Sequence, residues 1–237
     1  MFSKAKTFDK IPSMKDAIDN FDQLLPLMSE DPSNLHYVEI IRRRKDNPDD
    51  NPDDKEMKDS TVIKSYLLKG PNSLLKKKSE IVGLCQFFNA RAYIRMTPVS
   101  KKKVLKNVLH NFTDMIGAPD EDFNPVSRFW SSVGTGLDSS KKLWVIDCDD
   151  FSEEQCKALM KEIQKLHIIA GRLDHYPTNG VITKEVLAES LVHLVKTPNA
   201  YHILTVPFDQ ARLREKTGGL NLDVKKDGNT VLWAHIN

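Results

Sequence analysis

The stretch Leu143-Trp144-Val145-Ile146-Asp147-Cys148-Asp149-Asp150 joins an apolar, β-branched run to three carboxylates within four residues. The apolar run predicts a buried strand, and a core strand has no structural reason to end in so much negative charge. Side chains alternate between the two faces of a strand, so Asp147 and Asp149 project together with Val145. Two carboxylates about 7 Å apart along a strand can share one or two Mg²⁺ or Mn²⁺ ions, which prefer oxygen ligands.

A simpler explanation is that the acidic end of this strand only caps the following helix. It accounts for Asp150, because residues 150–155 have the pattern of a helix start with a capping box. It does not account for Asp147, which interrupts the apolar run itself. We therefore interpret Asp147 and Asp149 as candidate metal ligands.

Composition narrows the class of protein. At 237 residues the chain is long enough to bury one sizeable core, and 40% hydrophobic with 29% charged residues is typical of a soluble globular protein. No window approaches the length of a membrane span and residues 1–6 lack the apolar core of a secretory signal, so we expect a cytoplasmic location and no membrane partner. Three cysteines without a CxxC pair argue against a disulfide framework and a structural zinc site.

The net charge of +2 excludes a chain that binds polyanions over its whole surface. A nucleic-acid partner would therefore have to bind a local basic patch. An ordinary solvated face is the alternative explanation for each cluster of lysines. The candidate clusters are 76–78, 101–103, 141–142 and 225–226.

We expect an α/β (α+β) fold with a mixed β-sheet core flanked by helices. Residues 1–35 carry a weak helical pattern and form an N-terminal segment, a candidate contact for a protein partner. Residues 36–237 form a single core domain. Its acidic loop at 45–60 contains a tandem Asn-Pro-Asp-Asp repeat with no apolar residue to bury, which predicts a mobile connection between two antiparallel strands. Apolar spacing predicts helices at 73–88, 101–116, 152–166 and 183–195, strands at 37–42, 61–67 and 91–96, and a loop at 120–140.

The strand at 91–96 has two different faces. Arg91, Tyr93 and Arg95 share one of them, and apolar side chains share the other. Guanidinium groups bind phosphate through two parallel hydrogen bonds and aromatic rings stack on bases or sugars, so the row is typical of phosphate binding. The exposed face of an edge strand explains the same pattern equally well, and both interpretations stay open.

The last part of the chain supplies a histidine and another acidic strand. A Pro-Asn turn at 198–199 leads into a strand with His202 near its start. A lone histidine there is more often structural than catalytic, but this one lies beside a turn whose small residues let a ligand approach. An Asp-Gly-Asn turn predicts a hairpin over 220–234, on which Asp223 and Lys225 share a face.

This order of motifs resembles the catalytic core of the archaeo-eukaryotic primase superfamily, which includes the primase-polymerases of phages and plasmids. That family has an Asp-x-Asp on one strand, a small-residue turn with a histidine on a second, and a hydrophobic-Asp pair on a third. The patterns at 90–94 and 198–202 are also similar to those of uncharacterised phage-encoded proteins. The residues that match the three motifs are Asp147, Asp149, His202 and Asp223.

Three features depart from the pattern of this family. Ala200 occupies the position where a glycine is expected before the aromatic residue and His202. No zinc-binding cysteines accompany the core, and no helicase domain follows it. The last two departures favour a stand-alone or accessory role in DNA replication.

The resemblance implies a primase-like fold and a metal-dependent nucleotidyltransferase that binds a nucleoside triphosphate and nucleic acid. Attack of a 3′-hydroxyl on the α-phosphate would release pyrophosphate. By the resemblance, Asp147, Asp149, His202 and Asp223 are the catalytic residues. Mg²⁺ or Mn²⁺ is expected on Asp147, Asp149 and Asp223, and phosphates are expected against His202, Lys225, Arg91 and Arg95.

Two other functions stay open. Haloacid-dehalogenase-like phosphohydrolases also begin with a hydrophobic strand that ends in Asp-x-Asp, although Phe151 stands where they usually have Thr or Val and the strand lies late in this chain. A non-catalytic nucleic-acid-binding or protein-binding module with a primase-like fold fits Ala200 and the modest net charge. Metal binding that depends on Asp147 separates this module from both enzymes.

Overall fold

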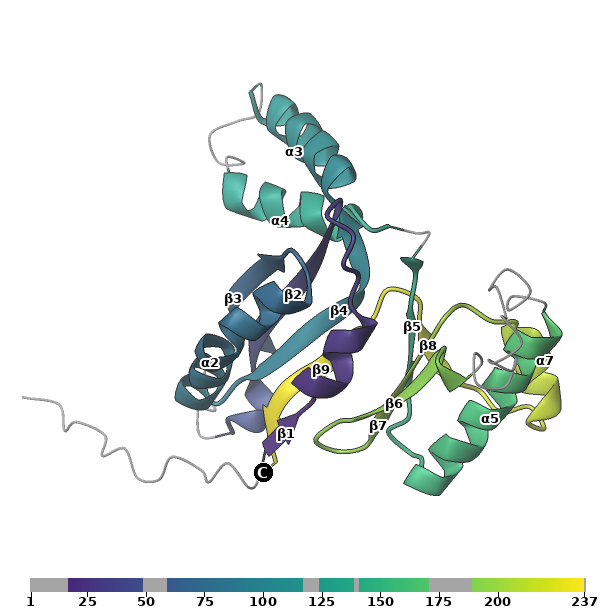
Figure 1. Ribbon diagram of the computed structural model, residues 1–237. Coiled ribbons are helices and arrows are strands. Elements are labelled where there is room, and N and C mark those ends of the chain that lie inside the picture. The colour runs from purple at the N-terminus through teal and green to yellow at the C-terminus, as the bar shows by residue number, and fades with distance from the viewer. Residues whose placement is uncertain (1–16, 49–58, 117–123, 139–140, 171–188, 237) are drawn as a thin grey trace, which may run out of the picture.

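Nine strands form two antiparallel sheets in the computed structural model, which describes residues 17–48, 59–116, 124–138, 141–170 and 189–236 (Figure 1). The five-stranded sheet has the order β1 (Ala17–Asp19), β9 (Asn229–His235), β4 (Arg91–Ser100), β2 (Asn34–Arg43), β3 (Ser60–Leu68). The four-stranded sheet has the order β6 (Val192–Lys196), β7 (Tyr201–Thr205), β5 (Trp144–Asp147), β8 (Asp223–Lys225).

Six α-helices and two short 3₁₀ helices accompany the sheets in the described part of the chain. The α-helices are α1 (Phe21–Leu24), α2 (Pro71–Phe88), α3 (Lys101–Met115), α4 (Pro125–Thr135), α5 (Glu153–Ile169) and α7 (Gln210–Lys216). The 3₁₀ helices are η2 (Leu25–Leu27) and η3 (Arg44–Asp46). None of the helices described here is both long enough and apolar enough to cross a membrane.

The predicted α+β class is confirmed, but the strands are arranged differently from the single mixed sheet that we expected. All the strand pairs described are antiparallel, and they fall into two separate sheets. The predicted antiparallel pairing of the strands on either side of the acidic loop is confirmed as β2 with β3. Most of that loop, residues 49–58, lies outside the described residues.

Local signals explain where the long helices begin. The Ser100 side chain accepts a hydrogen bond from the backbone of Lys103 at the start of α3. At the start of α5, Ser152 and Gln155 form the predicted capping box, each side chain bonded to the backbone of the other. The capping box also shows that Ser152, rather than Asp150, is the N-cap residue of α5.

The four-stranded sheet is built as a split β-α-β unit. Its chain order is β5, α5, β6, β7, α7, β8, and in space β7 and β5 are the central strands. Figure 1 shows α5 and α7 on the side of this sheet that faces away from the five-stranded sheet. Because side chains alternate along β5, Ile146 and Cys148 pack in the core under these helices, and Val145 and Asp147 project toward the other sheet.

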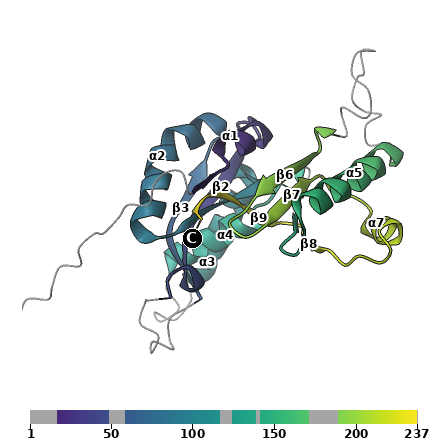
Figure 2. The same cartoon turned by 90° about the horizontal axis from the view of Figure 1, so that it is seen from below.

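The five-stranded sheet packs against α2, as Figures 1 and 2 both show. Its buried core includes Val38, Ile40, Ala92, Ile94 and side chains of α2, and it continues into the four-stranded sheet through apolar side chains of β5, β6 and β7. A shared core therefore joins the two sheets. The residues of the four-stranded sheet in this core are Val145, Val195 and Leu204.

Three predicted elements are wrong. The hairpin over 220–234 does not form, because β8 pairs with β5 while β9 pairs with β1 and β4 of the other sheet. The end of the predicted helix at 183–195 is strand β6, whose β-branched Val192 and Val195 are buried in the sheet; residues 183–188 lie outside the described part. The predicted loop at 120–140 contains α4, which begins at an Asn cap followed by proline.

The N-terminal segment also differs from the helical segment predicted for 1–35. From residue 17 onward it contains strand β1, which pairs with β9, and then the short helices α1 and η2. The Asn20 side chain donates hydrogen bonds to the carbonyl oxygens of Lys196 and Val231, one on each sheet. This segment therefore belongs to the core, and residues 1–16 lie outside the described part.

Candidate functional site

Antiparallel pairing places three of the predicted site residues in one row across the four-stranded sheet. His202 on β7 and Asp223 on β8 lie directly opposite Asp147, on either side of β5. Residues directly opposite each other in an antiparallel pair present their side chains on the same face. The row faces away from α5 and α7, toward the five-stranded sheet.

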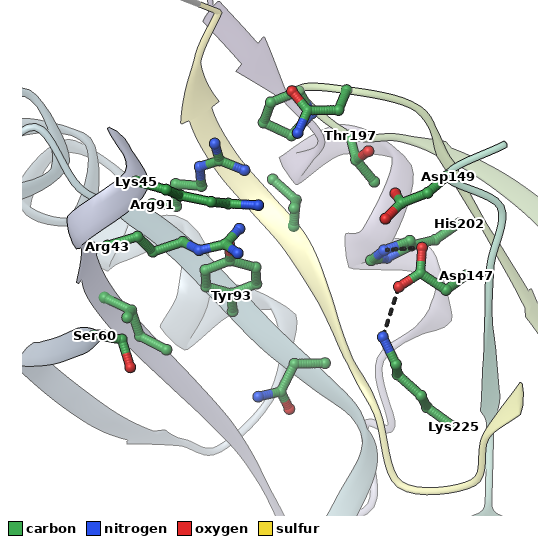
Figure 3. Close-up of a pocket in the computed structure, with 15 residues that line it drawn as sticks. Arg43, Lys45, Ser60, Arg91, Tyr93, Asp147, Asp149, Thr197, His202 and Lys225 are labelled. Atoms are coloured by element: carbon green, nitrogen blue, oxygen red, sulfur yellow. Dashed lines mark hydrogen bonds and ion pairs between the residues drawn. The ribbon is translucent and has the colours of Figure 1, made fainter. Parts of the chain in front are cut away.

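A cleft of about 390 Å³ lies between the two sheets at this row (Figure 3). Its volume is in the range of natural small-molecule sites. The wall on the four-stranded sheet is acidic at its centre, and the opposite wall, on the five-stranded sheet, carries arginine, lysine and tyrosine side chains. The first wall contains Asp147, Asp149, His202, Lys225 and the turn 197–199; the second contains Arg43, Lys45, Arg91, Tyr93 and Asn229.

The Asp147 carboxylate is held between a lysine and a histidine. Its Oδ2 accepts a hydrogen bond from Lys225 Nζ at 2.6 Å, and its Oδ1 lies 3.8 Å from His202 Nε2. Oδ1 is buried and has no hydrogen-bond partner. Burial alone would raise the pKa of Asp147, but the Lys225 hydrogen bond and the charges of His202 and Lys225 outweigh burial and lower it. Asp147 is therefore ionised at neutral pH with one oxygen left to accept a ligand.

The His202 side chain is mostly buried beneath Asp147. Burial lowers the pKa of His202, and this outweighs the opposing attraction of the nearby Asp147 carboxylate. Its Nδ1 lies 3.0 Å from Thr230 Oγ1 on β9, so the ring also bridges the two sheets. The neighbouring carboxylate favours a proton on Nε2, which leaves Nδ1 to accept from the Thr230 hydroxyl. His202 is then a neutral donor that points into the cleft.

The two other predicted metal ligands differ in position. Asp149 lines the cleft next to Asp147. Asp223, although opposite Asp147 in the sheet, does not line the cleft, and 65% of its side chain is exposed. Among the residues described, no three Asp, Glu, His or Cys side chains form a ready-made metal site. The predicted three-carboxylate site is therefore not assembled in this structure.

The two predicted phosphate-binding arginines both contact other side chains of the protein. Arg91 lines the cleft, but its Nη2 lies 2.5 Å from Asp46 Oδ1 in an ion pair that is almost completely buried. Arg95 lies over the ring of Tyr37 and donates to Asn229 Oδ1 at 3.3 Å. Arg95 does not line the cleft, because it lies four positions beyond Arg91, about 13 Å along the strand.

Arg43 and Lys45, which were not among the predicted site residues, supply much of the positive charge of the opposite wall. Arg43 Nη1 donates to the Tyr93 hydroxyl at 3.3 Å, so the predicted Tyr93 is tied to an arginine from the neighbouring strand. The signal was present in the sequence as four consecutive basic residues, 42–45, at the end of a predicted strand. Only the pairing of β2 with β4 shows that this run meets Tyr93.

The turn beside His202 does not need the glycine that the resemblance leads one to expect. Thr197 and Ala200 close it with two hydrogen bonds, from Thr197 N to Ala200 O at 2.9 Å and from Ala200 N to Thr197 Oγ1 at 3.0 Å. Asn89 is the one non-glycine residue with positive φ in the described part of the chain, so Ala200 lies in an ordinary backbone region. The alanine is therefore compatible with the geometry of the site.

The lysine clusters do not gather around the cleft. Lys78 pairs with Asp19, Lys141 with Asp31 and Lys142 with Asp227. The 101–103 cluster lies at the start of α3, and Figure 1 shows this helix at the end of the five-stranded sheet, away from α5 and α7. Of the four clusters, only the one at 225–226 reaches the cleft, through Lys225.

No family model, curated protein or solved structure matches this chain.

Proposed function

We propose that the cleft binds a nucleoside triphosphate together with Mg²⁺ or Mn²⁺, and that the protein is a metal-dependent nucleotidyltransferase of the primase-polymerase type. The observation that carries this proposal is that the two walls of the cleft bear opposite charges. Asp147 and Asp149 lie on one wall, and Arg43 and Lys45 lie on the other (Figure 3). A triphosphate with a bound cation needs both kinds of neighbour within one small site.

The residues of the acidic wall fit a divalent cation that arrives with its nucleotide. Mg²⁺ in such sites is commonly held by one or two carboxylates, with the remaining ligands supplied by water and phosphate oxygens. Asp147 offers a buried oxygen without a hydrogen-bond partner, and Asp149 offers a second carboxylate at the same cleft. When bound, the cation would neutralise charge on the reacting phosphates.

The protein's own side chains would orient the phosphates. Arg43 and Lys45 supply positive charge from the five-stranded sheet, and neutral His202 supplies a hydrogen-bond donor from the four-stranded sheet. In the proposed reaction a 3′-hydroxyl oxygen of a nucleic-acid strand forms a bond to the α-phosphorus. The bond from that phosphorus to the oxygen bridging to the β-phosphorus breaks, pyrophosphate leaves, and the proton of the 3′-hydroxyl passes to water. Holding the triphosphate in line for this attack is the main contribution expected of the cleft.

A binding assay tests this proposal directly. Labelled nucleoside triphosphate is titrated into the protein with and without Mn²⁺, for wild type and for the Asp147→Asn/Asp149→Asn double variant. Asp150→Asn is the matched control, because Asp150 belongs to the same acidic run but is exposed and does not line the cleft. We expect Mn²⁺-dependent binding in wild type and in the control, and at least a tenfold loss in the double variant. Equal binding by all three proteins would refute the proposal.

A non-catalytic nucleic-acid-binding or protein-binding module is the second candidate. It is favoured by the exposed position of Asp223, which leaves the carboxylate triad incomplete. Such a module would bind its partner equally well with and without Mn²⁺. A nucleotide-incorporation assay on a primed template separates it from a polymerase, and release of inorganic phosphate instead of pyrophosphate would indicate the phosphohydrolase alternative.

A further inference from the structure

The Lys225 ammonium group occupies the space between two of the predicted metal ligands. Its Nζ lies 2.6 Å from Asp147 Oδ2 and 3.5 Å from Asp223 Oδ2. A positive charge is therefore already present where the resemblance predicts a divalent cation. Lys225 was predicted to contact phosphate, and in this structure its hydrogen bond is made to a carboxylate instead.

The backbone around Lys225 fixes this arrangement. Lys225 is opposite Val145 in the sheet, two residue pairs away from Asp147 and Asp223, so its side chain reaches along β5 to the carboxylate. Gly228 packs the following turn tightly against both strands, because a Cβ atom there would lie 2.8 Å from Lys225 Cβ and 3.0 Å from Val145 Cβ. The Cβ of Lys225 is thereby held beside β5, while its side chain beyond Cβ stays partly exposed.

A divalent cation on the free Oδ1 of Asp147 would lie close to the Lys225 ammonium group, which is bonded to Oδ2 of the same carboxylate. The two positive charges repel each other, which favours departure of the ammonium group when the cation binds. Lysine has a flexible four-carbon stem, so its charge can move several ångströms while the backbone stays in place. Lys225 also lines the cleft, where the triphosphate is expected.

We propose that Lys225 is a resident cation that a divalent metal displaces from Asp147, and that the released ammonium group then binds the triphosphate. This inference rests on the proposed function. It makes Lys225 an exchangeable partner of Asp147: without metal it neutralises the carboxylate, and with metal it contacts phosphate. The site is thus kept close to electrically balanced in both states, and metal binding prepares the cleft for the nucleotide.

The exchange predicts that replacing Lys225 changes the affinities for Mn²⁺ and for nucleoside triphosphate in opposite directions. Lys225→Met keeps the apolar stem and removes the charge, so Mn²⁺ no longer has to displace an ammonium group. We expect Mn²⁺ alone to bind about tenfold more tightly than in wild type, and nucleoside triphosphate at saturating Mn²⁺ to bind about tenfold more weakly. Lys225→Arg restores a cation on the same strand and should return Mn²⁺ affinity toward the wild-type value.

Calorimetry and electron paramagnetic resonance of unbound Mn²⁺ measure the affinity of the protein for Mn²⁺ alone, and neither measurement depends on catalysis. Lys226→Met is the matched control, because Lys226 lies over the ring of Trp144 at 5.5 Å and has no ion pair with Asp147. Circular dichroism of each variant checks that it is folded. Tighter Mn²⁺ binding by Lys225→Met, but not by the control, would support the exchange.

Two results would overturn the proposed exchange of Lys225 for metal, and they have different meanings. If wild type binds Mn²⁺ and Lys225→Met binds it with equal or lower affinity, the exchange is wrong while the metal-dependent function stands. If none of these proteins binds Mn²⁺ with or without nucleotide, the metal site itself is wrong, and the exchange and the proposed function fall together.

Discussion

Replacing Arg91 with methionine should destabilise the protein far more than its position in a cleft would suggest. The guanidinium group pairs with Asp46 Oδ1 at 2.5 Å, and the exposed fractions of the two side chains are only 11% and 10%. Asp46 Oδ2 is buried without a hydrogen-bond partner. Removing the arginine would leave an uncompensated buried carboxylate, which costs about 3 kcal/mol of the free energy of unfolding. Arg91→Met/Asp46→Asn, which removes both charges, should cost only about 1 kcal/mol.

Urea denaturation followed by tryptophan fluorescence measures this difference. With a slope of about 3 kcal/mol per molar urea for a chain of this size, a loss of about 3 kcal/mol lowers the transition midpoint by about 1 M. Arg43→Met is the matched control, because Arg43 lines the same cleft but donates only a long hydrogen bond to Tyr93. It should shift the midpoint by less than about 0.3 M. If Arg91→Met is no less stable than Arg43→Met, the structural role assigned to the buried ion pair is wrong.

Two further predictions concern packing and pH. Gly228→Ala should destabilise the protein by about 1–3 kcal/mol, because the new methyl group would lie 2.8 Å from Lys225 Cβ. Gly83→Ala is the control: Gly83 has open space around it in α2, so this change should stabilise the protein by about 1 kcal/mol. Thermal unfolding of both variants gives the comparison, and a Gly228→Ala variant as stable as wild type would contradict the tight packing. Burial lowers the pKa of His36 and His235, so below about pH 6.5 the unfolded chain binds protons that the folded protein does not. Stability should therefore be highest above pH 6.5 and fall as the pH drops toward the folded-state values of these histidines. Urea midpoints at pH 7.5 and 5.5 measure the decline, His36→Gln should reduce it, and equal midpoints for wild type would refute the prediction.

The sequence was informative wherever a local pattern determines the structure. The helices α2, α3 and α5 follow from apolar spacing and from cap residues such as Ser100 and Ser152, because capping involves only residues a few positions apart. Strand alternation predicted that Asp147 and Asp149 project together; both line the cleft, although β5 ends at Asp147 and Asp149 lies in the turn that follows. Local chemistry is enough for these features.

The errors come from interactions between distant parts of the chain. The Asp-Gly-Asn turn has the composition of a hairpin, but the strands on either side of Gly228 join different sheets. Arg91 has the spacing of a phosphate ligand, but Asp46 neutralises it from a 3₁₀ helix 45 positions away. Asp223 matches a motif and is in register with Asp147, yet 65% of its side chain is exposed and it does not line the cleft. None of these partners can be identified from the spacing of nearby residues.

The position of β9 has a consequence for how the protein is made. Ala17 and its partner His235 lie 218 positions apart, and β9 separates β1 from β4 in the five-stranded sheet. While the ribosome is still translating the intervening residues, β1 and the edge of β4 have no neighbour between them. Closing so long a loop is entropically costly and slow, and an unpaired strand edge is prone to aggregation during that time. The strands β2, β3 and β4, and later the four-stranded unit between Trp144 and Lys225, can each pair internally before β9 emerges. Both charged walls should therefore form first, and β9, whose Thr230 bonds to His202, should join them last.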